Sequence, residues 1–406
     1  MDVYRKEVVD PGDRASARGK EACVRSYGNC PAAIVVPSTA AGFRGPVVHY
    51  WQRHILAAML NNFHSTDWSM GESTGNDGAG GKPGFFTLVG TPDVMRGAGW
   101  EIITMCADDK ARHGMLACIM SNEIQAKGVT DENYHIVEAL FDGYEKALKE
   151  SRLVNIYGEF AIMKNSINAF CDVNDGKQLV FLWSGTCLGL ASNALLITGK
   201  NIKPGMPIVG LWEDGYRCNG GTRLTGVSLA TWGPDIRDLM ANSDALKFIE
   251  KLTIPSKSYA GTVSRIVGWN DDGSVGTPKA KIHGIAHITG GGLWGKLKDI
   301  LPEGVGAHLG GMPDPAECLL EAQDLSLRLN DPKLHISDEA AYDIFHGACG
   351  MHLIVEPGDE WKVTQEAEKG GIKAFVIGET IASPTQEIAV VSRFSQKYGQ
   401  LIYPPA

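Results

Sequence analysis

Residues 282–304, IHGIAHITGGGLWGKLKDILPEG, constrain the fold of this chain more than any other stretch. The apolar residues 282–288 predict a buried strand, and residues 293–301 predict a helix that ends before a proline. The turn between them consists of Thr289, Gly290, Gly291 and Gly292. Glycines let backbone N–H groups approach an anion, and a helix N-terminus adds a favourable potential. A turn without a ligand needs only one or two glycines, so the sequence favours an anion-binding turn.

Strand-like and helical patterns alternate along the rest of the chain. Residues 32–36 and 100–104 have the apolar character of strands, and a further strand is expected at 206–211. Residues 131–152, DENYHIVEALFDGYEKALKESR, form the clearest amphipathic helix. Because strands and helices are intermixed, the sequence indicates an α/β or α+β fold.

The length of 406 residues exceeds that of a typical single core and predicts two domains of about 200 residues each. An uncharged run, residues 178–199, ends at a turn-rich segment, which places the boundary between domains 1–199 and 200–406. The run is long enough to cross a bilayer. Ser, Thr, Asn and Gly interrupt it, however, so we expect a buried strand followed by a loop and a second strand or helix.

Composition excludes several classes of function. The net charge of −9 argues against a nucleic-acid-binding protein. Nine cysteines without a C-x-x-C pair predict neither a zinc knuckle nor a disulfide framework, and they fit a reducing compartment. The charged start contains no secretory signal, so we expect a cytoplasmic protein that does not enter a membrane. No H-E-x-x-H or G-x-S-x-G motif indicates a zinc or serine hydrolase.

A second glycine-rich stretch, residues 73–86, STGNDGAGGKPGFF, suggests a phosphate-binding P-loop. A P-loop needs a glycine five positions before its Gly-Lys pair and a hydroxyl after the lysine. Asn76 and Pro83 occupy those two positions, so the P-loop interpretation fails at both ends. An aspartate, Asp77, and a lysine, Lys82, remain within a glycine string and need another explanation.

Three further carboxylates stand in apolar surroundings. Asp108 and Asp109 follow the strand expected within GWEIITMC, and Glu159 lies in YGEFAIM. Paired acids at the end of a strand suit Mg²⁺, which prefers a few carboxylate oxygens plus substrate phosphates. Taken alone, the Asp108–Asp109 pair is equally consistent with the start of a helix, where acidic residues are common.

A polar loop follows the strand expected near residue 211, in LWEDGYRCNGGTRL. Asn219 and Gly220 offer a ligand an amide and an open backbone, although the same dipeptide is typical of a simple turn. His287, at the end of the strand before the triple glycine, is a core residue, a residue that supports a catalytic one, or a catalytic residue itself. The residues alone do not separate these alternatives.

Taken in chain order, these segments resemble the aminoimidazole ribonucleotide (AIR) synthetase family, the phosphoribosylformylglycinamidine cyclo-ligases. AHITGGGLW, residues 286–294, is similar to that family's AH-[IL]-TGGG-[FL]-W segment. The other similar segments, in order, are DGAGGK (77–82), GWEIITMCADD (99–109), YGEFAIM (157–163), CNG (218–220), PSKSY (255–259) and FHGACGM (345–351), with Tyr4, Val9 and Asp10 at the start. The shared order covers nearly the whole chain.

The resemblance implies a two-domain fold in which an N-terminal sheet forms a homodimer and a C-terminal α/β domain covers the ligand. It implies ATP and Mg²⁺ as cofactors, a phosphorylated ribonucleotide as substrate, and ATP-dependent ring closure in purine biosynthesis. The implied metal ligands are Asp77, Asp109 and Glu159, with Asp77, Asp109 and Lys82 as catalytic residues. The implied nucleotide-binding residues are Asp77, Gly78, Lys82, Asp108, Asp109 and Glu159, and the implied substrate-binding residues are Asn219, Gly220, His287, Thr289, Gly290, Gly291 and Gly292.

Several positions depart from the family pattern. Gly81 replaces a threonine, Asp108 an asparagine, Ile162 a glutamate, Arg217–Cys218 a His-Ser pair, and His346 an asparagine. Residues 40–46, AAGFRGP, match the family's N-terminal glycine-rich loop only thinly. Two alternatives to the cyclo-ligase therefore stay open. One is another ATP-using relative, similar to formylglycinamidine ribonucleotide synthase or selenophosphate synthetase, and the other is a non-catalytic nucleotide-binding paralogue.

Overall fold

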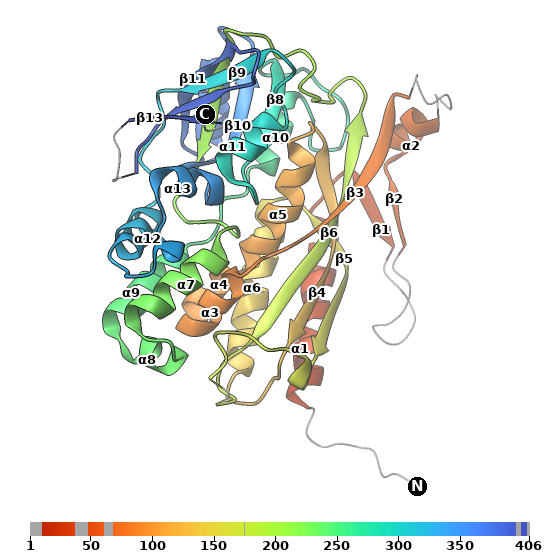
Figure 1. The fold of residues 1–406 in the computed structure, drawn as a ribbon. Coiled ribbons are helices and arrows are strands. Elements are labelled where there is room, and N and C mark those ends of the chain that lie inside the picture. Colours follow the sequence, from red (N-terminus) through yellow and green to blue (C-terminus); the bar gives the residue numbers. More distant parts are fainter. Residues whose placement is uncertain (1–9, 37–47, 61–67, 174, 395–398, 404–406) are drawn as a thin grey trace.

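The computed structural model describes residues 10–36, 48–60, 68–173, 175–394 and 399–403. The expected mixture of strands and helices is confirmed (Figure 1). The elements of the first half are α1 (Pro11–Ser26), β1 (Ala33–Val36), β2 (Val48–Trp51), α2 (Arg53–Leu60), β3 (Met70–Gly78), α3 (Lys82–Val89), α4 (Pro92–Gly97), α5 (Gly99–Ala111), β4 (Leu116–Ala126), α6 (Tyr134–Glu150), β5 (Val154–Ile162), η1 (Lys164–Ser166) and β6 (Phe181–Ser192).

The second half continues the alternation of strands and helices. Its elements are β7 (Pro207–Trp212), α7 (Gly221–Trp232), α8 (Ile236–Ala241), α9 (Ser243–Leu252), α10 (Ala260–Val267), β8 (Ile282–His287), α11 (Gly292–Lys298), β9 (Val305–Leu309), α12 (Glu317–Leu327), η2 (Pro332–Leu334), α13 (Asp338–Ile344), β10 (Cys349–Val355), α14 (Glu360–Lys369), β11 (Ala374–Ala382), β12 (Ile388–Val391) and β13 (Gln400–Tyr403).

The first sheet has the strand order β3-β6-β4-β5, with β4 and β5 parallel and the other pairs antiparallel. Helices α5 and α6 cover one face (Figure 1). On that face a Cβ at Gly185 of β6 would lie 3.0 Å from the Ile102 side chain of α5. The opposite face bears exposed apolar side chains, among them Tyr157 at 60% and Leu182 at 48% exposure. Among the described residues, this face of the sheet is therefore left open.

The prediction of a strand at residues 100–104 is wrong. These residues lie in helix α5, so Asp108 and Asp109 are in the last turn of a helix and not at the edge of a sheet. The helix is buried on nearly all sides, from Ile102 to Ala107 and beyond. Such a helix has a continuous apolar sequence, which periodicity cannot distinguish from a buried strand.

The other expected elements are present, with small shifts at their ends. The strand at 32–36, the helix at 131–152 and the strand at 206–211 correspond to β1, α6 and β7. The uncharged run 178–199 forms one long strand, β6, followed by turns and no second element. In the described ranges, no helix is both long and apolar enough to cross a membrane.

The second sheet has the order β13-β12-β9-β11-β7-β10-β8 and is antiparallel except for the β12–β9 pair. One hydrophobic core lies between this sheet and helices that include α7, α9 and α12. The other core joins α10 and α14 to the first sheet and its helices, with Val263 of α10 and Met351 of β10 in the same cluster as Ile102 of α5. The expected boundary near residue 199 falls between β6 and β7, and the division into two domains stays a prediction.

Candidate functional site

Two glycine-rich turns from opposite halves of the chain touch each other. Gly80, in the turn after β3, has φ +59°, and a Cβ there would lie 2.5 Å from the Cys218 carbonyl oxygen. A Cβ on Gly81 would lie 3.7 Å from the Cα atom of Gly221, at the start of α7. A side chain at Gly80 is excluded by both its backbone conformation and this contact. The glycines of DGAGGK therefore bring the backbones of two segments together.

The triple-glycine turn, residues 289–292, lies beside Asn219 and so reaches the same region. A Cβ on Gly290 would meet only the Asn219 Oδ1 atom, at 3.4 Å, whereas a Cβ on Gly292 would lie 2.2 Å from the Tyr342 carbonyl oxygen. The predicted strand, turn and helix are confirmed, with α11 starting at Gly292 after Gly291 at φ +94°. Gly292 is thus required for packing, and Gly290 faces space beside Asn219.

Helices α3, α7 and α11 all begin at this meeting point, at glycine N-caps. Because the three caps, Gly81, Gly220 and Gly291, are glycines, no cap side chain accepts a hydrogen bond from the first N–H groups of these helices. Asn219 Nδ2 is also buried, and it has no hydrogen-bond partner among the described residues. The site thus offers helix N-termini and an unsatisfied amide donor, which suit an anionic or oxygen-rich ligand.

Asp77 and Asp109 are the carboxylates nearest this region. Asp77 lies at the end of β3, and its Oδ1 atom accepts a 2.7 Å hydrogen bond from the N–H of Gly78. Burial raises the pKa of Asp77; the Gly78 N–H opposes this, Asp109 adds to it, and Lys296 of α11 lowers it. The effect of the Asp109 charge on Asp77 indicates that the two carboxyl groups lie near each other. A cation between the two carboxylates would relieve their repulsion.

Asp109 is held by hydrogen bonds and remains partly open to solvent, with a side chain 36% exposed. Its Oδ1 atom lies 2.8 Å from His287 Nδ1 and 3.5 Å from Arg112 Nε. Burial raises the pKa of Asp109, but the hydrogen bond from His287 and the charges of Arg112 and Lys296 outweigh it, so the pKa is lowered overall. Asp109 is therefore ionised at neutral pH, and its other oxygen is available to a ligand.

His287 has one defined tautomer. Its Nε2 atom lies 3.1 Å from the NH2 group of Arg217, which can only donate, so Nε2 accepts and Nδ1 carries the proton given to Asp109. Burial lowers the pKa of His287 to about 4, with the Asp109 hydrogen bond opposing and the Arg217 charge reinforcing the effect. His287 was predicted to bind substrate. Both of its ring nitrogens are occupied here, so it positions Asp109.

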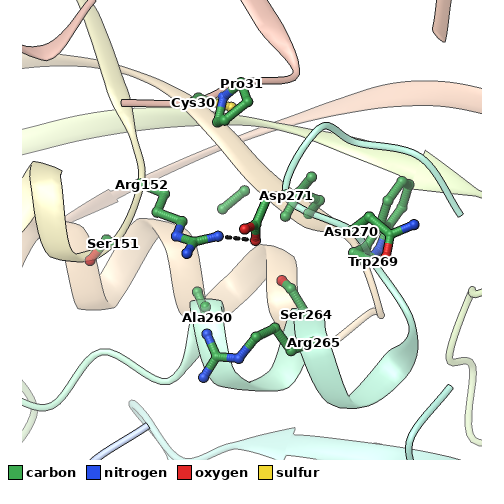
Figure 2. Close-up of a pocket in the computed structure, with 13 residues that line it drawn as sticks. Cys30, Pro31, Ser151, Arg152, Ala260, Ser264, Arg265, Trp269, Asn270 and Asp271 are labelled. Atoms are coloured by element: carbon green, nitrogen blue, oxygen red, sulfur yellow. Dashed lines mark ion pairs between the residues drawn. The ribbon is translucent and has the colours of Figure 1, made fainter. Parts of the chain in front are cut away.

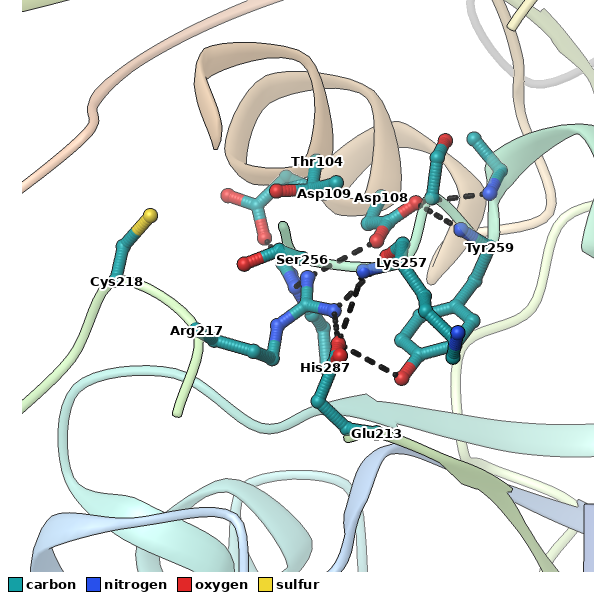
Figure 3. Close-up of polar contacts among 12 residues, drawn as sticks. Thr104, Asp108, Asp109, Glu213, Arg217, Cys218, Ser256, Lys257, Tyr259 and His287 are labelled. Carbon is teal, nitrogen blue, oxygen red and sulfur yellow. Dashed lines mark hydrogen bonds and ion pairs between the residues drawn. The ribbon is translucent and has the colours of Figure 1, made fainter. Parts of the chain in front are cut away.

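Arg217 lies at the centre of a buried polar network, shown in Figure 3. Its guanidinium is 2.8 Å from Glu213 and 3.1 Å from Asp108, and all three side chains are at most 1% exposed. Asp108 also accepts hydrogen bonds from the N–H groups of Tyr259 and Ala260, at 2.9 and 2.8 Å. Burial raises the pKa of Asp108 to about 7 against the opposing effect of Arg217. The nucleotide-binding role predicted for Asp108 does not fit this burial, since its oxygens join α5 to α10.

Lys82 likewise has internal partners. Its Nζ atom lies 2.9 Å from Glu101, 2.7 Å from the Ile254 carbonyl oxygen and 3.2 Å from Ser256 Oγ, and the side chain is 0% exposed. The ammonium group is therefore used in a buried ion pair between α3 and α5. Its predicted phosphate-binding role remains a prediction, and this geometry argues against it.

Glu159 lies apart from the other predicted metal ligands. In the sheet register it pairs with Glu123, Glu123 with Ser184, and Ser184 with Gly78. Three strand spacings of about 4.8 Å thus separate Glu159 from β3, or roughly 14 Å. Its side chain is exposed on the open face of the sheet, opposite the helices. The structure brings Asp77 and Asp109 together but not Glu159, and the described residues contain no group of three or more metal-ligating side chains.

Two cationic residues of the site were missed from the sequence. Lys296 lies on α11 and lowers the pKa of both Asp77 and Asp109. It lies in the last turn of a short helix, where a lysine is common for other reasons, so no clear signal in the sequence indicated it. Arg217 was recognised only as a departure from a family motif, and no local pattern predicts its burial.

Comparison with known proteins shows which proteins this chain is similar to. Residues 274–391 match the AIR synthase related protein, C-terminal domain. The chain is 27% identical over 307 residues to the phosphoribosylformylglycinamidine cyclo-ligase of Methanocaldococcus jannaschii, covering 76% of this chain and 77% of that protein. Over 324 residues it is 26% identical to the cyclo-ligase of Symbiobacterium thermophilum, covering 79% and 82%.

A solved structure supports the assignment of the fold. The crystal structure of thiamine-monophosphate kinase from Stenotrophomonas maltophilia matches with a TM-score of 0.52 and 13% identity, covering 94% of this chain and 96% of that one. The two chains therefore share a fold, and residues 274–391 match the AIR synthase related C-terminal domain. Over about three quarters of its length the chain is similar to phosphoribosylformylglycinamidine cyclo-ligases, as its motifs predicted.

Proposed function

We propose that this protein is an ATP-dependent cyclo-ligase that closes formylglycinamidine ribonucleotide to aminoimidazole ribonucleotide. The contact between Asp109 and His287 is the principal support, because it joins the MCADD segment to the AHITGGG segment across 178 positions of sequence. Asn219 and Gly290 meet in the same region. Several of the segments that resemble the cyclo-ligases thus meet in the fold, although YGEFAIM does not.

In the proposed reaction, the γ-phosphoryl group of ATP is transferred to the formyl oxygen of the substrate, and ADP leaves. The amidine nitrogen then attacks the same carbon, and the C–O bond breaks to release phosphate as the ring closes with loss of a proton. Phosphate replaces a poor leaving group. Such a reaction depends mainly on positioning and on neutralising phosphate charge.

The two carboxylates fit a magnesium ion of the kind that binds with a nucleotide. Mg²⁺ usually takes one or two carboxylates and completes its coordination with water and substrate phosphates, so a closed protein cage is not needed. Asp77 and Asp109 would hold the ion, which when bound would neutralise charge on the phosphates. Lys296 is the cation that we propose for phosphate contact, because Lys82 is buried against Glu101.

The triple-glycine turn is proposed to hold the ribose phosphate. Gly290 has no close neighbour on its open side except Asn219, and Asn219 Nδ2 lacks a partner in the described part of the chain. A substrate oxygen would satisfy this buried donor, whose desolvation otherwise costs about 1–3 kcal/mol. Thr289 and the backbone of Gly291 would complete the turn.

A homodimer through the open face of the first sheet is also proposed. Tyr157 and Leu182 are exposed there, and a second copy would cover them. Glu159 lies on the same face, so any role in the site would require the dimer. Tyr157→Glu should convert a dimer to monomers in light scattering; a wild-type chain that is monomeric at all concentrations would refute the proposal.

The experiment that tests the function uses purified protein with ATP, Mg²⁺ and formylglycinamidine ribonucleotide. We expect equimolar release of phosphate and aminoimidazole ribonucleotide. Binding of ATP without any product would instead indicate a nucleotide-binding paralogue. No turnover of this substrate, combined with turnover of another amide or of selenide, would indicate a different ATP-using relative.

A further inference from the structure

A second polar groove lies away from the glycine-lined site. It has a volume of about 860 Å³ and runs between the end of α6, the start of α10 and the turn from α14 to β11. Its lining includes none of Asp77, Asp109, Asn219 or the triple glycine. A small hollow of about 30 Å³ adjoins it, and Ser151, Arg152, Gly261 and Arg265 line both (Figure 2).

Arg265 is the distinctive residue of this groove. Among the described residues that line it, Lys257 is paired with Asp214 at 3.2 Å and Lys369 with Glu366 at 2.6 Å. Arg265 makes no ion pair with a described carboxylate, and its NH2 group donates only to Thr262 Oγ1, at 3.1 Å. The pKa of Arg265 is lowered by burial first and by the charge of Arg152 second. Arg265 is thus a partly buried cation beside a second cation.

Arg152 has a partner that an incoming anion could replace or join. It forms an ion pair with Asp271, and both side chains are more than half exposed, at 51% and 60%. Exposed pairs of this kind contribute only about 0–1 kcal/mol. Arg152 also has φ +56°, a backbone conformation that is uncommon for a residue with a side chain. Asp271 pairs with Arg152, whereas the carboxylate whose charge acts on Arg265, Glu366, is already paired with Lys369.

An apolar hollow of about 550 Å³ continues from the groove. Trp100, Ile254 and Pro255 line both cavities. The groove that Arg152 and Arg265 line thus also has an aromatic side chain, Trp100, in its wall. The groove and the hollow together are long enough for more than a bare ion.

We propose that this groove binds the phosphate group of a small phosphorylated molecule, with Arg265 and Arg152 as the principal contacts and Trp100 against the organic portion. Two guanidinium forks match the several oxygens of a phosphate better than they match a single carboxylate. The ligand would contact α5 and the turn after α6 in the first half, and α10 in the second. This site does not depend on the proposed cyclo-ligase activity.

Titration of the full chain with inorganic phosphate and with phenyl phosphate, followed by calorimetry at 150 mM salt, tests the proposal. Arg265→Gln and Arg152→Gln should each weaken binding at least tenfold. Arg237→Gln, at an exposed arginine on α8, is the matched control and should leave it unchanged. Phenyl phosphate should bind several-fold more tightly than phosphate, and Trp100→Leu should remove that gain.

Gly290→Ala distinguishes phosphate bound at the triple-glycine turn from phosphate bound in the groove. This variant should leave groove binding unaltered. Arg265→Lys retains the charge without the fork and should give an intermediate affinity, which separates loss of a contact from loss of folding. Equal affinity of the wild type and Arg265→Gln would overturn the proposal. So would the absence of measurable binding by the wild type at this salt concentration.

Discussion

His287 Nδ1 lies 2.8 Å from Asp109 Oδ1, and this contact joins the last turn of α5 to the end of β8. Arg217 occupies the other ring nitrogen of His287, at 3.1 Å. The arginine therefore fixes the tautomer of the histidine, and the histidine fixes the orientation of the aspartate. A residue that contacts no ligand can thus control the geometry of one that does.

Replacement of Asp109 by Asn should reduce phosphate release at least 100-fold while leaving the fold intact. The amide cannot neutralise a cation, and the side chain is partly exposed, so its loss costs little stability. Steady-state phosphate release and thermal unfolding are the two measurements. Normal turnover in this variant would refute the metal-binding assignment.

The neighbouring Asp108 is the matched comparison. Asp108→Asn should destabilise the protein by about 1–3 kcal/mol, because the amide nitrogen would face the guanidinium of Arg217 without accepting its hydrogen bond, while Glu213 still balances the charge. Chemical denaturation measures this directly. If the two variants had the same stability, the separation between a structural aspartate and a ligand-binding one would be wrong.

Arg217→Met should also cost about 3–5 kcal/mol, since Glu213 and Asp108 would remain buried without their cation. It should also free Nε2 of His287 and raise the pKa of that ring, because the Arg217 charge lowers it. Histidine NMR titration in the variant measures the second effect. An unchanged His287 titration would show that Arg217 does not control its tautomer.

Gly290→Ala and Gly292→Ala should differ although the residues are close neighbours. A methyl group at Gly292 would lie 2.2 Å from the Tyr342 carbonyl oxygen and would force the backbone to move, so this variant should be destabilised by more than 2 kcal/mol. Gly290→Ala should fold normally and raise the KM for the ribonucleotide. Unaltered substrate kinetics in the Gly290 variant would argue against a phosphate at this turn.

Lys82 and Glu101 test whether the first glycine-rich loop is structural. Lys82→Met should cost about 3–5 kcal/mol by leaving Glu101 buried without a cation. Lys82→Met combined with Glu101→Gln should recover part of that loss, because neither charge then remains. A double variant no more stable than the single one would indicate that Lys82 acts mainly elsewhere.

Stability at acid pH should depend on His352, whose ring nitrogens have no hydrogen-bond partner in the described ranges. Burial lowers its pKa to about 3, below the unfolded value of about 6.5, so the unfolded chain binds more protons in this window. Its contribution to stability is complete above pH 6.5 and is lost as the pH falls towards 3. Between these pH values, the titration of His352 changes the free energy of unfolding by about 1.4 kcal/mol per pH unit.

His352→Leu is the variant that isolates this effect. It should be at least as stable as the wild type at pH 7.5, because an apolar side chain replaces an unsatisfied donor. Between pH 6 and 4 it should lose less stability than the wild type. Denaturation curves with the same pH dependence for both proteins would contradict the assignment.

The sequence by itself determined the elements whose signals are local. The glycines between residues 289 and 293 predicted the turn from β8 to α11, and the amphipathic pattern at 131–152 predicted α6. The order of the motifs also predicted the relationship to the cyclo-ligases. Each of these depends on residues that are close along the chain, where backbone preference and periodicity act.

Only the tertiary structure decided which charged side chains are available to a ligand. Lys82 and Asp108 have the same local character as Lys296 and Asp109, yet the first two are enclosed by Glu101 and Arg217. Helix α5 resembled a strand because it is buried on nearly every side, and Glu159 was separated from Asp77 by the strand order β3-β6-β4-β5. Burial and strand order are set by contacts between distant segments, and no local pattern in the chain records them.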